Sequence, residues 1–501
     1  MRSLFLKTSL LLVVLLAVAG FFHHYFWYAL SVVLLLTAIG IYNMLQTRHT
    51  ILRNFPVIGY FRYFFEFISP EIQQYFIERH TDGTPLSRNH RRIVYERAKD
   101  LRSTHPFGTE LDLYSPRYEG FKHSIYPANE VSGDLRVQVG GADCKQPYSA
   151  SIYNISAMSF GAISRNAVLA MSRGAAEGGF YHNTGEGGLS DYHLQGGGDL
   201  VWQIGTGYFG CRTSEGRFDS ESFRDKAARE QVKMIELKLS QGAKPGHGGV
   251  LPAGKNSPEI ARVRQLEPHK AVISPPGHRE FNDAEGLLRF IAKLRGLSDG
   301  KPVGFKLCIG RKKEFIELCQ VMQSTGIKPD FITVDGAEGG TGAAPLEYSD
   351  SVGMPLQPAL RFVDETLREQ GLREEIRVIA SGKIVTAAQL IKMLSLGADL
   401  CNAARAFMLA VGCIQAQRCD TNRCPTGVAT QDPQLVKGLV VEDKYIRVAN
   451  FHRNTVESVR GLLAACGVTR LEDLTPDLFM HACDWPETGR NTKPTGTDLS
   501  R

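Results

Sequence analysis

Two long uncharged apolar runs open the sequence, over residues 10–22 and 25–45. Roughly 20 consecutive apolar residues cross a hydrocarbon layer of about 30 Å, so the second run is long enough and the first is nearly so. The pattern predicts a transmembrane helical hairpin over residues 1–46. A cleaved signal peptide is the alternative for the first run, because the triplet Ala-Val-Ala that ends at Ala19 has the small-x-small form of a cleavage site.

Basic residues flank the predicted hairpin at both ends. They are Arg2 and Lys7 before it and Arg48, Arg53 and Arg62 after it, whereas the turn between the runs, His23-His24, carries only histidine. Lysine and arginine next to membrane spans stay on the cytoplasmic side. We therefore expect the hairpin to lie in the inner or cell membrane, with both of its ends and the catalytic part of the chain in the cytoplasm.

Residues 47–125 are predicted to form a juxtamembrane segment of helical and charged character. Aromatic side chains crowd residues 60–76, which suits either a helix in the membrane interface or a helix buried against the main domain. Charged residues dominate from 80 to 125, and the run HRRIVYERAKDLR from His90 is typical of a surface helix.

From about residue 150 onward, short apolar runs rich in β-branched residues alternate with segments of helical periodicity. Eight runs are expected to be strands: Ser151–Ile155, Val201–Ile204, Met234–Leu239, Ala271–Ile273, Val303–Leu307, Phe331–Val334, Arg377–Ala380 and Asp399–Asn402. Parallel strands need crossover connections, and eight of them close a sheet. The pattern therefore predicts an α/β chain with a (β/α)8 barrel, a TIM barrel, over residues 126–470. An open doubly wound sheet is the alternative, and a polar C-terminal tail is expected over residues 471–501, loose from Pro486 onward.

Composition and charge exclude several classes of protein. Of the 501 residues, 43% are hydrophobic and 22% are charged, as in ordered globular chains. A formal net charge of +6 is close to balance for this length, and DNA- and RNA-binding motifs are not evident, so no nucleic-acid partner is expected. Ten cysteines are too few for a disulfide scaffold, so any cluster among them indicates metal or redox chemistry.

Cys413, Cys419 and Cys424 form such a cluster, with the spacing C-x5-C-x4-C. Three thiolates this close in sequence can ligate three irons of one iron–sulfur cluster. A zinc site would need a fourth ligand at similar spacing, and the nearest histidine, His452, is about thirty residues away. A chance grouping of buried free thiols is the alternative.

Glycine-rich loops follow several predicted strands, at the face where barrel enzymes hold their active sites. After the last two strands the loops read Ser381-Gly382-Lys383 and Ala403-Ala404-Arg405, at positions that often bind a phosphate. Lys383 and Arg405 would add positive charge there, unless they are an ordinary surface lysine and a helix-capping arginine. The G-x-G-x-x-G match at residues 205–210 is not followed by an apolar helix, so we do not expect a dinucleotide site there.

Charged side chains accompany these loops. Lys306 emerges directly from the apolar run at residues 303–305, where it could stabilise negative charge on the N1/O2 edge of a flavin. Glu186, Lys244 and Asp335 close other strands or lie in the loops after them. Glycine-rich turns also carry charged residues for solubility alone, and that is the alternative for Glu186 and Lys244.

Six motifs, in the same order, resemble the FMN-binding synthase domain of glutamate synthase large subunits. They are MSFGAIS from Met158, NTGEGG from Asn183, LSQGAKPGHGG from Leu239, ISPPGH from Ile273, DGAEGGTGAAP from Asp335 and CDTNRCPTGVATQDP from Cys419. The resemblance covers roughly residues 130–465. It implies FMN at the mouth of the barrel, a [3Fe-4S] cluster on the three cysteines, and a hydride transfer from reduced FMN to the 2-iminoglutarate formed from 2-oxoglutarate and ammonia, which gives L-glutamate.

The same resemblance implies roles for individual residues. The isoalloxazine ring would be bordered by Ala157, Met158 and Ser159, and its polar edge would contact Gln241 and Lys306. The ribityl phosphate would lie near Gly339, Gly340, Gly382, Lys383 and Arg405. Glu186 and Lys244 would be the catalytic residues that face the carboxylates of 2-oxoglutarate and the imine.

The sequence also departs from the family pattern. It begins MRSLFLK, without the nucleophilic cysteine and amidotransferase domain of glutamine-dependent members, and without their β-helix or an NADPH-binding half. We expect free ammonia or a separate glutaminase subunit to supply nitrogen, and ferredoxin or a separate NAD(P)H-oxidising subunit to supply electrons through the cluster.

The substrate loop departs as well, because His247 and Val250 replace an acid and an amide of the usual GAKPGEGGQLP. Specificity depends on pairing such polar groups. The alternative function is therefore a membrane-anchored oxidoreductase on the same barrel that acts on a different 2-oxo acid, an imine or a quinone-linked acceptor. A non-catalytic scaffold has no reason to keep the cysteines and the flavin loops together.

Overall fold

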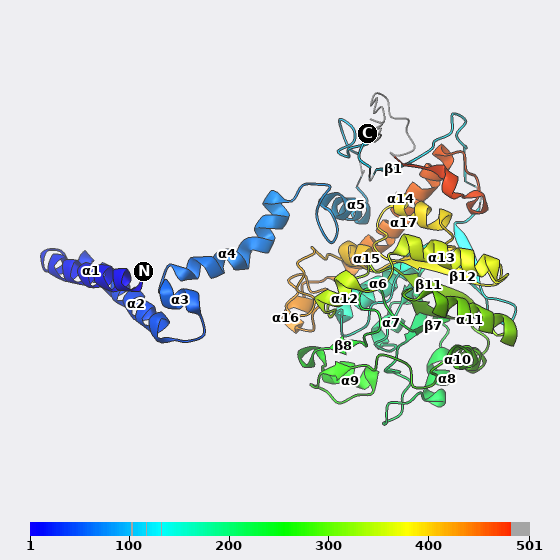
Figure 1. Cartoon of the computed structure of the whole chain (residues 1–501), viewed down its shortest axis with the longest axis horizontal. Helices are drawn as coiled ribbons and strands as arrows, with labels where there is room; N and C mark the ends of the chain where they lie inside the picture. Colours follow the sequence, from blue (N-terminus) through cyan, green and yellow to red (C-terminus); the bar gives the residue numbers. More distant parts are fainter. Residues whose placement is uncertain (102–103, 117, 132, 482–501) are drawn as a thin grey trace, which may run out of the picture. The chain divides into compact units, whose positions relative to one another are not determined.

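The computed structural model describes residues 1–101, 104–116, 118–131 and 133–481. The chain divides into two compact units, Met1–Arg88 and Asn89–Arg501. The described part of the first unit is helical, and the second unit contains the β-sheets (Figure 1).

The first unit begins with two antiparallel helices, α1 (Arg2–Phe22) and α2 (Tyr25–Leu45), which pack against each other. Both are long and apolar enough to cross a membrane, judged by length and composition. Three shorter elements follow: α3 (Thr50–Asn54), α4 (Gly59–Ile72) and the π-helical turn η1 (Gln73–Ile77). Only Gly59 is buried in α4, and the aromatic side chains of this helix are exposed except for the half-buried Tyr63.

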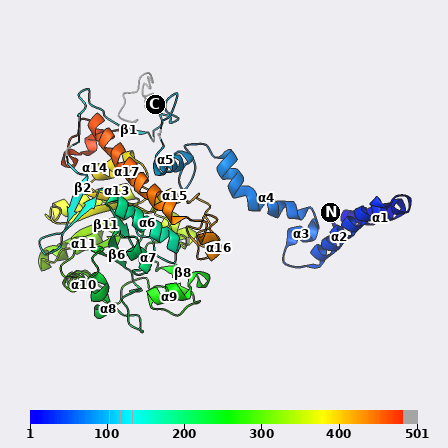
Figure 2. The same ribbon diagram turned by 180° about the vertical axis from the view of Figure 1, so that it is seen from behind.

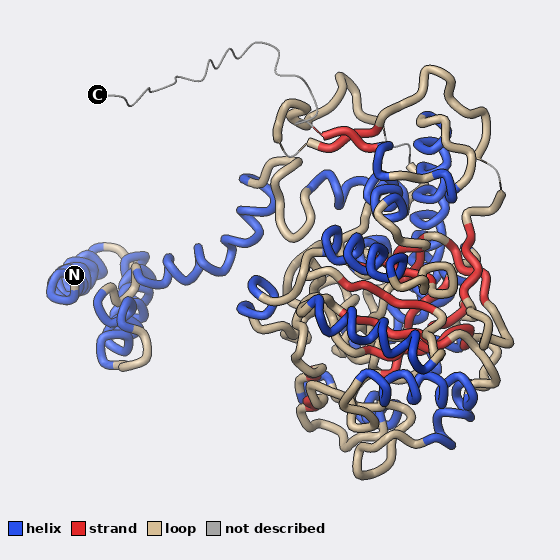
Figure 3. The backbone as a smooth tube through the Cα atoms, turned by 45° about the vertical axis from the view of Figure 1, so that its right-hand side comes forward, coloured by secondary structure: helices blue, strands red, loops and turns tan. Residues whose placement is uncertain are grey.

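Eight parallel strands close a barrel in chain order at the centre of the second unit (Figure 3). They are β4 (Tyr153–Ile155), β5 (Tyr181–Asn183), β6 (Asp199–Ile204), β7 (Val232–Lys238), β10 (Val303–Leu307), β11 (Phe331–Asp335), β12 (Arg377–Ser381) and β13 (Leu400–Ala403). The closed sheet confirms the predicted (β/α)8 barrel and excludes the open doubly wound sheet.

One of the eight predicted strands was wrong and one barrel strand was missed. Residues 271–273 contain β9 (Val272–Ile273), which pairs antiparallel with β8 (Val250–Leu251) outside the barrel, and Ile273 is exposed. The missed strand, β5, has only three residues and includes His182, so it forms no apolar run. Barrel neighbours on both sides bury it completely, which the local sequence does not reveal.

Helices surround the barrel. They are α6 (Arg165–Gly178), α7 (Asp191–Gln195), α8 (Ser220–Ala227), α9 (Pro258–Arg264), α10 (Ala284–Leu297), α11 (Lys312–Thr325), α12 (Leu346–Ser351), α13 (Leu356–Glu369), α14 (Ala387–Ser395), α15 (Arg405–Ala410), α16 (Pro433–Val436) and α17 (Val441–Ala465). The long α17 lies against α6 (Figure 2). Local sequence sets their ends: α6 begins at Ser164, whose side chain accepts a hydrogen bond from the Ala167 N–H, and ends at Gly179 in the left-handed conformation.

A β-hairpin closes the N-terminal end of the barrel. Its strands are β2 (Arg136–Val139) and β3 (Tyr148–Ser151). Their side chains form one buried apolar cluster with residues of the barrel strands β5, β6, β7, β11, β12 and β13. The Tyr148 hydroxyl also donates to Asp199 at the start of β6, at 2.9 Å. The C-terminal mouth is therefore the open end of the barrel.

Three further segments complete the second unit. Helix α5 (Arg88–Ala98) is not purely a surface helix, because Val94 and Ala98 on one of its faces are buried. Strand β1 (Glu119–Phe121) pairs antiparallel with β14 (Phe479–His481), which follows the 3₁₀ turns η3 (Leu471–Asp473) and η4 (Pro476–Leu478). The loose tail expected from Pro486 lies outside the described residues.

Candidate active site

A cavity lies among the C-terminal ends of the barrel strands. Its lining contains all but two of the residues that the resemblance assigns to FMN: Ala157, Gln241, Lys306, Gly339, Gly340, Gly382, Lys383 and Arg405. Met158 and Ser159 do not line it. They lie against Gly185 of the loop after β5, where a Cβ would come 2.6 Å from the Ser159 backbone nitrogen.

Two positive side chains share one part of this cavity. Burial lowers the pKa of both Lys383 and Arg405, and the Arg405 charge lowers the pKa of Lys383 further. Within the described residues, no carboxylate lies within ion-pair distance of either group. Gly340 leaves space beside Arg405, since a Cβ there would come 3.2 Å from its Nη1. Paired cations beside bare glycine backbone suit a dianionic phosphate, so these residues fit the phosphate of FMN.

Lys306 forms a buried ion pair with Asp335. Its Nζ lies 3.3 Å from Oδ2 of Asp335, which also accepts a hydrogen bond from the Gly242 N–H at 2.8 Å. Burial alone would lower the pKa of Lys306, but the charges of Asp335 and then Glu236 outweigh it and raise the pKa. Lys306 therefore keeps a positive charge in this cavity.

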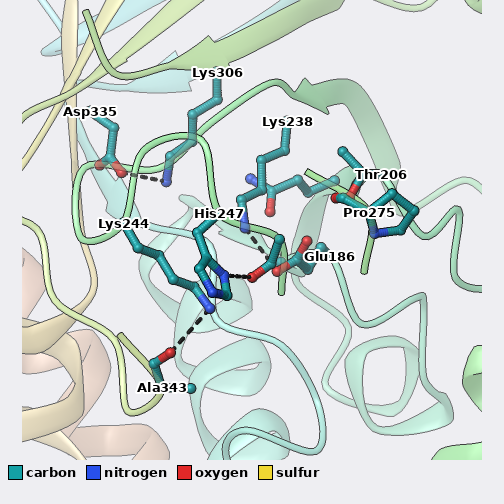
Figure 4. A network of polar contacts seen from close by, with 12 residues as sticks. Glu186, Thr206, Lys238, Lys244, His247, Pro275, Lys306, Asp335 and Ala343 are labelled. Atoms are coloured by element: carbon teal, nitrogen blue, oxygen red, sulfur yellow. Dashed lines mark hydrogen bonds and ion pairs between the residues drawn. The ribbon is translucent and has the colours of Figure 1, made fainter. Parts of the chain in front are cut away.

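A second group of charges lies next to this cavity (Figure 4). Glu186, from the loop after β5, accepts a hydrogen bond from Lys238 at the end of β7, with 2.8 Å between Oε1 and Nζ. Its carboxylate lies between Gly205 and Gly249, since a Cβ at either glycine would come 2.6 Å from one of its oxygens. Burial would raise the pKa of Glu186, but Lys238 and more weakly Arg264 lower it, so the group is ionised.

Lys244 is the lysine of this group that has no carboxylate partner among the described residues. Its side chain is 1% exposed, and its Nζ donates to the Ala343 carbonyl at 3.2 Å. Burial and the nearby charge of Lys238 lower its pKa, against the opposing effect of Glu186. A buried ammonium with only a carbonyl partner can take a substrate carboxylate as its counterion.

The two substituted positions of the substrate loop differ in their surroundings. The His247 ring packs edge-on against Tyr348, and its Nδ1 lies 2.9 Å from the Gly248 carbonyl. Val250 begins β8. Close by, the buried Ser274 hydroxyl has no hydrogen-bond partner in the described part of the chain, and its oxygen lies 3.3 Å from where a Gly249 Cβ would be.

Sequence reasoning missed Lys238 and Glu236. Glu236 is buried inside the barrel, where its carboxylate accepts hydrogen bonds from Asn183, Gln203 and Thr333. The sequence did contain a signal for them. Glu236 and Lys238 are two positions apart in a largely apolar strand, and side chains at that spacing point to the same face of a sheet. In a closed barrel that face is either the interior or the helix layer, and a charge at the strand end then points to the mouth.

The three cysteines lie in the loop that follows α15. They interact electrostatically, and burial raises the pKa of Cys413 and Cys419. Burial would also raise the pKa of Cys424, but hydrogen bonds from the Thr426 side chain and from nearby backbone N–H groups lower it. Among the described residues, no three Cys, His, Asp or Glu side chains gather closely enough to hold a single metal ion.

Comparison with known proteins relates this chain to the same family that the sequence motifs resemble. Residues 142–469 match the family model described as the conserved region in glutamate synthase. The chain is 41% identical over 464 residues to the glutamate synthase large subunit-like protein YerD of Bacillus subtilis, covering 84% of this chain and 88% of that protein. It is 36% identical over 327 residues to the archaeal glutamate synthase [NADPH] of Methanocaldococcus jannaschii, covering 64% of this chain and 60% of that protein.

Among solved structures, a mutant flavocytochrome b2 with pyruvate bound aligns with a TM-score of 0.45 at 13% identity, covering 83% of this chain and 85% of that one. The barrel is established by the strand topology of the chain itself. The protein is an FMN-dependent oxidoreductase acting on amino or imino groups. The family match makes the assignment more specific: the chain belongs to the glutamate synthase family.

Proposed function

We propose that this protein makes L-glutamate from 2-oxoglutarate and ammonia at the mouth of the barrel. FMN, when bound, would supply the hydride that reduces 2-iminoglutarate. The observation that carries the proposal is the position of Lys244. This buried lysine has no carboxylate partner in the described ranges, and it lies beside the Glu186–Lys238 ion pair and next to the cavity at the strand ends.

Each charge has a specific task in this proposal. Lys244 would bind a carboxylate of the 2-oxo acid. The ionised Glu186 would accept a hydrogen bond from ammonia or from the iminium N–H, and Lys238 would hold Glu186 in place. Lys306 would face the electron-rich edge of the flavin. These polar groups would orient the imine carbon at the mouth of the barrel.

The substituted substrate loop supports a second candidate function. His247 is held against Tyr348 and its own loop, and Val250 offers no polar atom from its side chain. A different 2-oxo acid, an imine or a quinone-linked acceptor would suit this less polar end of the site. The charges around Lys244 favour an anionic acceptor and therefore the first candidate.

We further propose that the three cysteines hold a [3Fe-4S] cluster through which electrons enter. The Gln415 N–H lies 3.4 Å from the Cys413 sulfur, and the Cys424 sulfur lies 3.4 Å from the Thr426 hydroxyl. Such hydrogen bonds stabilise thiolate ligands and tune cluster potentials. A three-iron cluster also holds its cysteines further apart than a single ion does, so thiols that do not gather around one ion among the described residues are compatible with such a cluster.

The donor and the nitrogen source would be separate proteins or small molecules. The archaeal relative is named for NADPH, and this chain spans 60% of its length. We propose that a ferredoxin or a separate NAD(P)H-oxidising subunit donates the electrons. Free ammonia or a separate glutaminase subunit would supply the nitrogen.

One experiment tests the cofactors and the reaction together. Protein purified anaerobically should release FMN on heating and contain about three irons per chain, as a three-iron cluster requires. After reduction, its flavin should be reoxidised by 2-oxoglutarate only when ammonium is present, and L-glutamate should accumulate. Spectroscopy of the flavin and chromatography of the products give both readouts.

Different failures of that experiment have different meanings. FAD or colourless protein would contradict the flavin assignment, and one zinc per chain would contradict the cluster. Reoxidation by another 2-oxo acid or by a quinone, with no response to 2-oxoglutarate and ammonium, would replace the first candidate function with the second.

The two apolar helices support membrane anchoring, and we propose that α1 and α2 form a hairpin with both ends in the cytoplasm. A cysteine introduced as His24→Cys should react with a membrane-impermeant thiol reagent added to intact cells. A cysteine introduced as Lys7→Cys is the matched control and should stay unreactive until the cells are opened. Labelling of position 7 from outside would contradict the topology.

A further inference from the structure

A buried lysine lies outside every role assigned above. Lys255 ends the 3₁₀ turn η2 (Ala253–Lys255), and its side chain is 3% exposed. Its Nζ lies 2.6 Å from the Cys419 carbonyl oxygen, 3.0 Å from that of Ala429 and 3.3 Å from that of Ala162. Three carbonyl acceptors use three N–H donors, which an ammonium group has and a neutral amine lacks.

The three acceptors belong to two different loops. Cys419 and Ala429 lie in the cysteine loop, which contains two further candidate ligands of the cluster. Ala162 lies in the loop after β4, the loop that begins at the flavin cavity with Ser156 and Ala157. A single ammonium group therefore joins the cysteine loop to the loop that enters the flavin site.

Neutral groups join the same two loops. The Gln431 side-chain amide donates to the carbonyls of Gly161 and Ile163, at 3.0 Å each. The Ser164 N–H donates to the Val428 carbonyl at 2.8 Å. Of the hydrogen bonds named here between the two loops, those from Lys255 come from a charged group and the others from neutral groups.

The charge of Lys255 interacts with two of the cysteines. No carboxylate lies within ion-pair distance of its Nζ in the part of the chain that the structure describes. The acidic groups that interact with it electrostatically are Cys419, then Cys424 and then the exposed Asp420. A buried positive charge without an ion pair stabilises any negative charge that develops beside it.

We propose that Lys255 is a positioning residue that holds the cysteine loop against the loop after β4 and raises the reduction potential of the redox centre on the three cysteines. This inference rests on the proposed iron–sulfur function. Reduction adds one electron to the centre, and the fixed positive charge favours the more negative, reduced state. The centre would then accept electrons from a donor more readily than it would without Lys255.

Lys255→Met tests the charge, because methionine keeps most of the side-chain volume. At an effective dielectric constant of about 20, a unit charge about 10 Å from the centre would change the reduction equilibrium by about tenfold. For a one-electron couple, tenfold is 59 mV. We therefore expect the midpoint potential of the centre to fall by about 59 mV, measured by a dithionite titration of the whole protein followed by paramagnetic resonance.

Three controls separate charge from packing. Lys255→Arg keeps the charge and should leave the potential near that of wild type, whereas Lys255→Gln keeps a donor without the charge and should lower it. Gln431→Met removes the neutral hydrogen bonds and should leave the potential unchanged. Loss of iron from the Met and Gln variants with retention in the Arg variant would also support the proposal, because the charge is then needed to hold the cluster.

The outcomes distinguish this inference from the function on which it rests. Wild-type protein without an iron–sulfur signal would overturn the cluster itself. A cluster that keeps its wild-type potential in both Lys255→Met and Lys255→Gln would overturn only the role of Lys255. An equal fall in Gln431→Met would show that loop packing, and not the charge, sets the potential, and would also overturn the proposal.

Discussion

Lys244→Met is expected to lower kcat/KM for the 2-oxo acid by about 10²–10³-fold while FMN stays bound. Removing one partner of a buried charged hydrogen bond costs about 2–5 kcal/mol, and every 1.4 kcal/mol is about tenfold. Lys244 is not among the residues that line the cavity proposed for FMN, and it is not part of the Lys306–Asp335 ion pair. The flavin should therefore be retained. Steady-state assays with an artificial electron donor, together with the flavin absorbance, measure both quantities.

The pH profile adds a second readout to this prediction. The protonated form of Lys244 binds the carboxylate, and that form is lost as the pH rises through its pKa. Because burial and Lys238 lower this pKa, kcat/KM should fall on the alkaline side before the ordinary lysine range is reached. Lys313→Met, at an exposed lysine, is the matched control and should change neither kcat/KM nor the profile. An unchanged kcat/KM in Lys244→Met would exclude it from substrate binding.

Asp335→Asn is expected to lower the free energy of unfolding of the barrel unit by about 3–5 kcal/mol. The change leaves the Lys306 ammonium buried without its partner at 3.3 Å, and breaking a buried ion pair from one side has about this cost. The shift of the urea midpoint at constant slope measures it.

Two further variants make this prediction specific. The double change Lys306→Met with Asp335→Leu removes both charges and should recover most of the lost stability, since an apolar pair leaves no buried charge. Asp473→Asn breaks the exposed Arg470–Asp473 pair and should have no measurable effect. A double variant as unstable as Asp335→Asn alone would show that packing, and not the unpaired charge, causes the loss.

The barrel could be predicted from the sequence because most of its strands are apolar runs that end in glycine-rich loops. Strand β5 could not be, since its three residues are buried by neighbours that lie far away in the sequence. The regularity of the fold explains why residues as distant as Gln241 and Arg405 were expected in one cavity: a barrel gathers all its strand ends at one mouth.

Side-chain partners were harder to predict than positions. Glu186 was expected at the mouth, but its ion pair with Lys238 depends on the geometry of two loops and a strand end. The same holds for Lys255, which sequence reasoning passed over because only the folded chain brings Ala162, Cys419 and Ala429 around one lysine.

The hairpin of β2 and β3 covers the N-terminal end of the barrel and leaves the C-terminal mouth as its open end. In the described part of the chain, apolar side chains of this hairpin and of the barrel strands pack together at the opposite end. The proposed cofactor, 2-oxo acid and product would all pass the C-terminal mouth, where the loops after β7, β11, β12 and β13 converge. A prosthetic group bound in this cavity would lie between the barrel interior and solvent, so the proposed substrate would have to approach it from the same side by which the group itself entered.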